Sequence, residues 1–313
     1  MAKHASHPDY PPANRKYFPA ACLALLLCFA VAAQNDSTGL NRKRLNTVII
    51  GGSVAYAGTM AGLYQLWYKD HPQSSFHFIN DNDEWMGLDK TGHAFTAYWL
   101  GWAGYQTLRW AGVKDKKAVW YGGCTGLIFQ TTIEVFDGFS AGWGASPGDM
   151  LANVAGTGLF IGQQLAWQEQ RILLRFSYHP TVYAQYRPDV LGKTKLENLL
   201  KDYNGHTYWL SANIRSFIPE SSRFPPWLNI AFGYGAKGML GGSENKTEYE
   251  GQPLPHYRRT SRWFMSLDIE LGRIPVRSAT LKKILTALGF IKIPMPTIEY
   301  NAEDRFKLHI LYF

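Results

Sequence analysis

The stretch that decides the fold of the C-terminal half is Arg262-Trp-Phe-Met-Ser-Leu-Asp-Ile-Glu-Leu271. Its odd-numbered positions are apolar, and four of its five even-numbered positions are polar or charged. An alternation with period two is typical of a β-strand with one apolar face. The pattern recurs in Trp227–Tyr234, Thr207–Ile214 and Arg305–Tyr312. We therefore expect residues 170–313 to form an antiparallel β-sheet or a partial barrel.

Two placements suit the apolar face of these strands. It can face lipid in a small or partial barrel, or it can pack on helices. Five or six strands are few for a closed membrane barrel, which favours a packed or partly lipid-facing sheet. Two short amphipathic helices, Lys193–Tyr203 and Ser278–Phe290, are expected as insertions between strands.

Residues 46–168 differ from this pattern, because their apolar runs are long and helical. The first, Asn46–Tyr68, contains no charge and has the length of a membrane span. Its small residues, Gly51, Gly52, Ala55, Gly58 and Gly62, lie at spacings of three and four and would let helix backbones approach closely. Three further helices are expected at Asp89–Trp110, Ala118–Phe136 and Pro147–Gln168. The sequence therefore predicts an α+β fold with an N-terminal four-helix membrane-like bundle.

Polar residues on these helices are the candidate functional residues. A charge in an apolar helix is costly, so it usually has a partner or a task. Asp89 and His93 are four residues apart and share a helix face, and so do Asp149 and Asn153. In a bundle these faces would converge. The candidates are His93, Asp89, Lys90 and Glu134 for catalysis, Asp137, Asp149 and Asn153 for binding, and His93, Asp89, Glu134 and Asp149 for a metal.

Two classes of function fit these residues. In an envelope lipid- or glycan-modifying enzyme, His93 would be the general acid or base, held by Asp89 or Glu134. A divalent metal such as zinc, manganese or iron would suit the same mixed ligands. In a structural or assembly protein, the residues would form a buried hydrogen-bonded network. A histidine on an apolar helix is usually structural, so we favour the structural class over the enzyme. A third class, transport or sensing, ranks below both. No cofactor is established by the sequence.

Composition points to the cell envelope. The chain carries a net charge of +8, 15% aromatic residues and only 18% charged residues. It has no nucleic-acid-binding signature, so we expect outer-membrane lipids, and a possible envelope protein, as partners.

The first 33 residues read as a signal peptide. Arg15 and Lys16 precede an apolar run that ends in Val31-Ala-Ala33. Cys22 and Cys28 lack the small residues that precede a lipidated cysteine, so lipidation is not predicted. After cleavage Cys124 alone would remain, which excludes an internal disulfide.

Several motifs resemble the YfiM-like family, a domain of unknown function (2279) of Bacteroidota described as predicted periplasmic or outer-membrane proteins. The resemblance implies an envelope location and no activity. The residues that carry it are Phe76–Trp85, Asp89–His93, Asp137–Trp143, Gly148–Asn153, and Lys201–Asn204 with Trp209.

The helical part also resembles the VanZ-like membrane family. There an Asp-Lys-x-x-His run opens one helix, a Glu closes the next, and an Asp with an Asn opens a fourth. Asp89, Lys90, His93, Glu134, Asp149 and Asn153 match in order. The connection after Glu134, Asp137–Trp143, departs from that family, so the resemblance implies no shared substrate.

Overall fold

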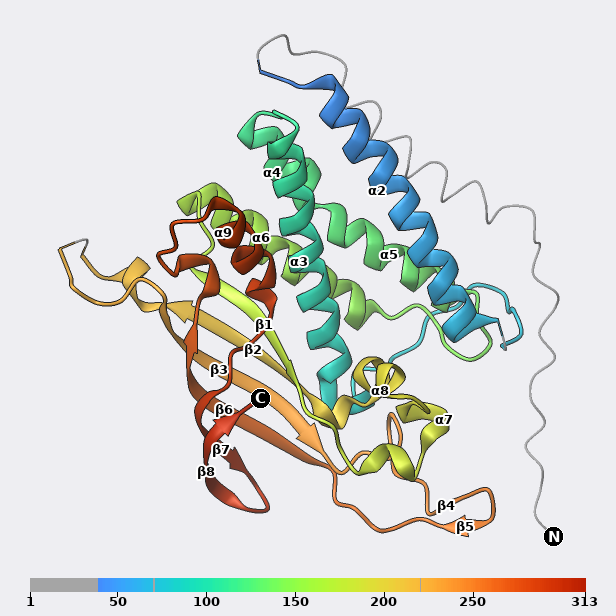
Figure 1. Cartoon of the computed structure of the whole chain (residues 1–313). Coiled ribbons are helices and arrows are strands. Elements are labelled where there is room, and N and C mark those ends of the chain that lie inside the picture. Colours follow the sequence, from blue (N-terminus) through green and yellow to red (C-terminus); the bar gives the residue numbers. More distant parts are fainter. Residues whose placement is uncertain (1–38, 70, 220) are drawn as a thin grey trace. The chain divides into compact units, whose positions relative to one another are not determined.

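The computed structural model describes residues 39–69, 71–219 and 221–313 (Figure 1). The predicted signal peptide lies outside the described residues. The chain divides into two compact units. Within the described residues, unit 1 comprises residues 39–80 and Thr96–Leu165, and unit 2 comprises Asp81–Phe95 and Ala166–Phe313.

Unit 1 is helical. In its apolar core, Met60 and Tyr68, from the end of the first helical segment, pack with Phe136 from the middle of the chain. The aromatic rings of Tyr68 and Phe136 meet edge to face at 5.6 Å. The helices, coloured blue to green in Figure 1, are α2 (Arg42–Leu63), α3 (Leu88–Trp110, of which the part from Thr96 belongs here), α4 (Asp115–Gly123), α5 (Thr125–Gly138) and α6 (Pro147–Trp167).

Backbones approach most closely where α3 meets α4 and α5. A Cβ atom added to Gly122 would lie 2.3 Å from the Tyr105 nitrogen, and one added to Gly126 would lie 2.0 Å from the Ala97 carbonyl oxygen. Only glycine fits at such distances. The sequence predicted close packing on the first helix instead, but a Cβ atom added to Gly58 there would have no described atom within 4 Å.

The prediction of a four-helix membrane-like bundle is wrong. Among the described residues, no helix is both long enough and apolar enough to cross a membrane. The first helix, α2, begins with three basic residues, Arg42-Lys43-Arg44. The uncharged part that follows is rich in glycine and alanine, which are only weakly apolar. The last buries the polar side chains Asp149, Asn153, Gln163 and Gln164. The predicted third helix is two helices, separated at Cys124.

Unit 2 is built on a six-stranded sheet in which every neighbouring pair is antiparallel. The α+β class and the antiparallel sheet are therefore confirmed. In sheet order the strands are β1 (Ile172–Tyr178), β2 (His206–Asn213), β3 (Leu228–Lys237), β6 (Thr260–Ile269), β7 (Met295–Asn301) and β8 (Arg305–Tyr312) (Figure 1). A small hairpin and short helices connect them: β4 (Glu248–Tyr249), β5 (Gln252–Pro253), α7 (Pro188–Leu191), α8 (Lys195–Lys201) and α9 (Ala279–Ala287).

The sheet buries its polar face and exposes its apolar one. On β6, Arg262, Ser266 and Asp268 are buried, whereas Trp263 is 57% exposed and Met265 is also exposed. The alternation predicted from the sequence is therefore real. Its apolar side is covered in part by unit 2 itself, since Tyr208 lies against Phe95 at a ring distance of 5.7 Å. The rest of that side faces outward.

Candidate functional site

Asp89 lies in the first turn of α3, just after a 3₁₀ turn that ends at Gly87. An anion is favoured there by the helix dipole. Its Oδ1 accepts a hydrogen bond of 2.7 Å from the Tyr203 hydroxyl, and the Tyr203 ring stacks on Trp85 at 5.1 Å. The carboxylate thus joins the start of α3 to the loop before β2 within unit 2.

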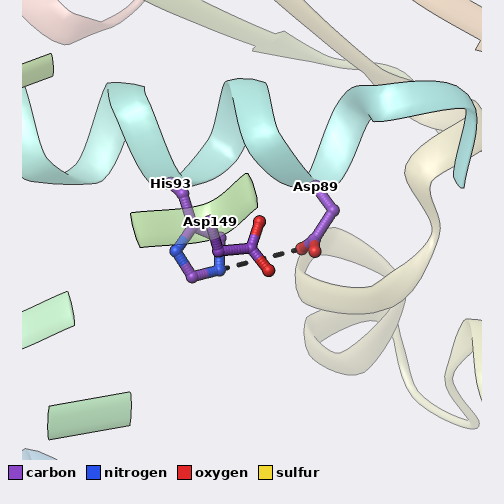
Figure 2. A group of neighbouring side chains, drawn as sticks. All are labelled: Asp89, His93 and Asp149. Carbon is purple, nitrogen blue, oxygen red and sulfur yellow. Dashed lines mark ion pairs between the residues drawn. The ribbon is translucent and has the colours of Figure 1, made fainter. Parts of the chain in front are cut away.

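Lys90 and His93 complete this group. Lys90 Nζ lies 2.6 Å from Asp81 Oδ1 and 3.5 Å from Asp89 Oδ2. His93 Nε2 lies 4.0 Å from Asp89 Oδ1, one helical turn along, as Figure 2 shows with a dashed line. The side chains of all four residues are largely shielded from solvent. The structure therefore brings together Asp89, Lys90 and His93, as the sequence predicted, and adds Asp81.

In unit 1, Glu134 organises the start of α6. Its buried Oε2 accepts a hydrogen bond of 2.8 Å from the Ser146 backbone N–H, and Ser146 Oγ accepts one of 3.1 Å from the Asp149 N–H. Ser146 is thus the N-cap of α6, and Glu134 takes the place of the side chain that completes a capping box. Asp149 is buried in the first turn and Asn153 is buried one turn later.

Asp137 has a different environment. Its Oδ1 accepts a hydrogen bond of 2.7 Å from the Tyr68 hydroxyl at the end of the π-helical turn that follows α2. Burial, followed by the charge of Asp137, raises the pKa of Tyr68. The described contacts of Asp137 therefore tie α5 to the end of the first helix.

Two described residues of unit 2, Asp89 and His93, can offer a metal ion one carboxylate oxygen and one ring nitrogen. These ligand types suit zinc, manganese or iron. Asp149, also labelled in Figure 2, belongs to α6 in unit 1. Glu134, the fourth predicted ligand, has the capping role described above.

The interior of the sheet holds charges that sequence reasoning missed. Arg262 donates two hydrogen bonds, of 2.8 and 2.9 Å, to the two oxygens of Glu299, and His309 Nε2 lies 2.7 Å from Glu299 Oε2. Burial opposes ionisation of Glu299, but the hydrogen bond and charge of Arg262, with help from His309, lower its pKa to about 2.

A second buried group surrounds Lys292, whose Nζ donates hydrogen bonds to the carbonyl oxygens of Leu267 and Ile293 and lies 3.8 Å from Asp268. Burial lowers the pKa of Lys292 to about 8. Asp268 in turn pairs with Arg175. The only signal for these groups in the sequence was the run of polar residues at alternate strand positions, which reads equally well as a solvent face.

The outward face of the sheet consists of cross-strand rows. One row runs through Leu210, Phe232, Met265, Ile298 and Leu308, each the register partner of the next. All five are exposed, Phe232 by 54% and Leu308 by 72%. No residue in this row is charged, so it forms an apolar band across five strands.

An aromatic row follows at the next outward positions toward one end of the strands. Tyr234 is the partner of Trp263, Trp263 of Tyr300, and Tyr300 of Phe306. Lys237, at the end of β3 and in phase with its inward positions, forms ion pairs of 2.9 and 2.7 Å with Glu303 and Asp304 in the turn between β7 and β8. Along the strands the face therefore passes from aliphatic to aromatic groups, and charged residues follow in the turn beyond them. We name the aliphatic and aromatic rows together the outward face.

The fold and these groups define an α+β protein with a helical unit and a sheet unit that buries paired charges, among them Arg175, Asp268 and Glu299. Residues 77–162 match the model of a family described as predicted periplasmic lipoprotein (DUF2279). The predicted resemblance to that family is confirmed over these residues, which include every candidate site residue. Comparison with curated proteins and with solved structures gave no significant match. The VanZ-like resemblance and the assignment to Bacteroidota stay predictions.

Proposed function

We propose that this chain is a structural protein of the cell envelope that attaches to outer-membrane lipid through the outward face of its sheet. The match to a family of predicted periplasmic lipoproteins supports the envelope location. The observation that carries the proposal is the uncharged band from Leu210 to Leu308, bordered by aromatic residues and then by charged ones.

This order of groups is the one that a lipid layer favours. Hydrocarbon accepts aliphatic side chains, tryptophan and tyrosine prefer the boundary with the headgroups, and charged groups stay in water. The sheet buries its polar side and exposes its apolar side, and this supports the same conclusion. A large contiguous apolar surface in water is rare and marks a binding surface.

The candidate polar residues fit a structural role in this proposal. Asp89 accepts a hydrogen bond from Tyr203, Asp137 accepts one from Tyr68, and Glu134 caps α6. Each carboxylate thus holds two elements of its own unit together. Satisfied polar networks of this kind fix a packing without catalysing a reaction.

The test is flotation of the purified chain with phosphatidylcholine vesicles. The double variant Phe232→Ser/Met265→Ser removes two neighbouring exposed side chains of the band and should weaken binding by at least about tenfold, since each buried side chain contributes on the order of 1 kcal/mol. Val182→Ser, at another exposed apolar site of unit 2, should bind as the wild type does. A wild-type chain that does not float would overturn the proposal.

A second candidate, an envelope lipid- or glycan-modifying enzyme, is favoured by one observation. The imidazole of His93 lies 4.0 Å from the Asp89 carboxylate, with Lys90 beside it. A carboxylate can orient a histidine for general acid–base chemistry, and a lysine can bind an anionic group. The His93 variant discussed below separates this candidate from the structural one.

A further inference from the structure

An amphipathic helix, α9, lies in the connection between β6 and β7. Its N-cap is Ser278, whose hydroxyl accepts a hydrogen bond of 3.2 Å from the Leu281 N–H. Leu281, Ile284 and Leu288 follow at intervals of three and four residues. These spacings place the three side chains in one apolar stripe.

The stripe faces away from unit 2. Leu281, Ile284 and Leu288 are exposed, Ile284 by 51%. The adjoining side of the helix rests on the unit, because Lys282, Leu285 and Thr286 are half-buried and Thr286 adjoins Gly272. Packing within the unit therefore leaves the apolar stripe uncovered.

The surroundings of the stripe are basic. The sequence contains no acidic residue from Leu271 to Ile298. Arg277 and Lys283 are exposed, and Lys282 is half-buried with its Nζ donating a hydrogen bond of 3.2 Å to the Ile274 carbonyl. An exposed apolar stripe thus lies among cations whose charge no nearby residue of the segment offsets.

Two other basic residues of the segment belong to the interior instead. Arg273 pairs with Glu270 at 2.9 Å and with Glu169 at 3.1 Å. Lys292 is fully buried. The cations available to a partner are therefore Arg277, Lys282 and Lys283.

We infer that α9 binds the surface of a membrane that carries anionic lipid headgroups. The leucine and isoleucine stripe enters the headgroup boundary, and Arg277 and Lys283 lie against lipid phosphates. A helix with an apolar face and a lysine- and arginine-rich border binds in the plane of such a surface. This inference rests on the proposed attachment to lipid and adds the charge of the lipid that is bound.

The test compares flotation with phosphatidylcholine vesicles and with vesicles that also contain phosphatidylglycerol. The wild type should bind the anionic vesicles more tightly, and salt should weaken that preference. Arg277→Gln/Lys283→Gln should reduce binding to anionic vesicles by about fivefold for each cation removed and leave binding to neutral vesicles unchanged. Lys246→Gln, which removes an exposed lysine elsewhere in unit 2, is the matched control.

The apolar stripe is tested separately with Leu281→Gln/Ile284→Gln, which should weaken binding to the anionic vesicles. Its thermal melting should match the wild type, because both positions are exposed. Equal binding of the wild type to neutral and anionic vesicles would overturn this inference and leave the attachment through the sheet intact. Failure to bind either kind of vesicle would instead overturn the proposed function. Loss of binding in Lys246→Gln as severe as in the double variant would show that general charge, and not α9, attracts the lipid.

Discussion

Arg175 Nε lies 2.6 Å from Asp268 Oδ2, although β1 and β6 are separated in the sheet by two strands. Strands in a flat sheet are spaced about 4.8 Å apart, so these two would be about 14 Å apart. The contact therefore requires a strongly curved sheet with both side chains on its concave side. Both are fully buried. The curvature allows the side of the sheet that carries Arg175 and Asp268 to form the interior of the sheet unit.

Removing one partner of this pair should be strongly destabilising. Arg175→Met would leave Asp268 buried, with the hydrogen bond from Ser211 and with Lys292 3.8 Å away as its described polar contacts. A broken buried pair costs about 3–5 kcal/mol. Urea unfolding should show a loss of this size, and Arg175→Met/Asp268→Leu should recover much of it. A single variant within about 0.5 kcal/mol of the wild type would contradict this account of the interior.

Glu299 should make the sheet unit sensitive to acid. Its pKa is about 2 in the folded chain against a usual 4.5. Because the folded pKa is the lower one, the stabilisation is present above pH 4.5 and is lost as pH falls toward about 2. The difference in melting temperature between the wild type and Glu299→Gln should be largest above pH 4.5 and shrink below it. A difference that stays constant across this window would exclude Glu299 as the titrating group.

Burial of the charged Lys292 should cost stability at neutral pH, and this cost should decline as pH rises. Its pKa is about 8 in the folded chain against a usual 10.5. Below pH 8 both states carry the charge, and folding must bury it. As pH rises from about 8 to 10.5 the folded chain loses its proton first, so this cost declines. Relative to Lys292→Met, the wild type should therefore gain stability over that range in urea titrations at several pH values. An unchanged difference would show that the lysine does not titrate there.

The helical unit offers a matched pair of glycine substitutions. Gly126→Ala would place a methyl group against the Ala97 carbonyl and should cost roughly 1–3 kcal/mol by overpacking. Gly58→Ala, in the interior of α2 where the added Cβ meets no described atom, should stabilise by up to about 1 kcal/mol. Thermal melting of both variants checks the assignment. Equal effects would mean that the close approach of α3 and α5 is absent.

His93→Ala separates the structural from the catalytic interpretation. If the group around Asp89 and Lys90 is structural, the variant should melt at a lower temperature and be less abundant in cells, with a cost of roughly 1–3 kcal/mol. If His93 is catalytic, the protein should melt normally but fail to complement a strain that lacks it. Tyr203→Phe, which removes only the hydrogen bond to Asp89, is the companion variant. A His93 variant with normal stability and normal complementation would exclude both interpretations.

Part of the candidate site was readable from the sequence. Residues four apart on a helix share a face, so the pairing of Asp89 with His93 followed from spacing. The partners of these residues did not. Asp81 and Tyr203 reach Lys90 and Asp89 from separate parts of the chain, and spacing carries no information on such contacts.

The helical half was predicted less well, because an uncharged run is not the same as an apolar one. Asn46–Tyr68 contains no charge, yet its glycines, serine and threonines contribute little apolar surface. The break at Cys124 and the close approach at Gly122 and Gly126 depend on how the helices pack. These are properties of the assembled unit.

The alternation of residues was enough to predict four of the six strands, β2, β3, β6 and β8, and the side of each on which the apolar residues lie, since a side-chain period of two follows from backbone geometry alone. It did not identify β1 or β7. The predicted starts of two helices, Pro147 and Ser278, also lie within one residue of the observed ones. Tertiary packing, by contrast, determines that the polar side is the interior. That outcome depends on the curvature of the sheet, which lets Arg175, Asp268, Glu299 and Lys292 pair with groups distant in sequence and so offsets the cost of burying their charges.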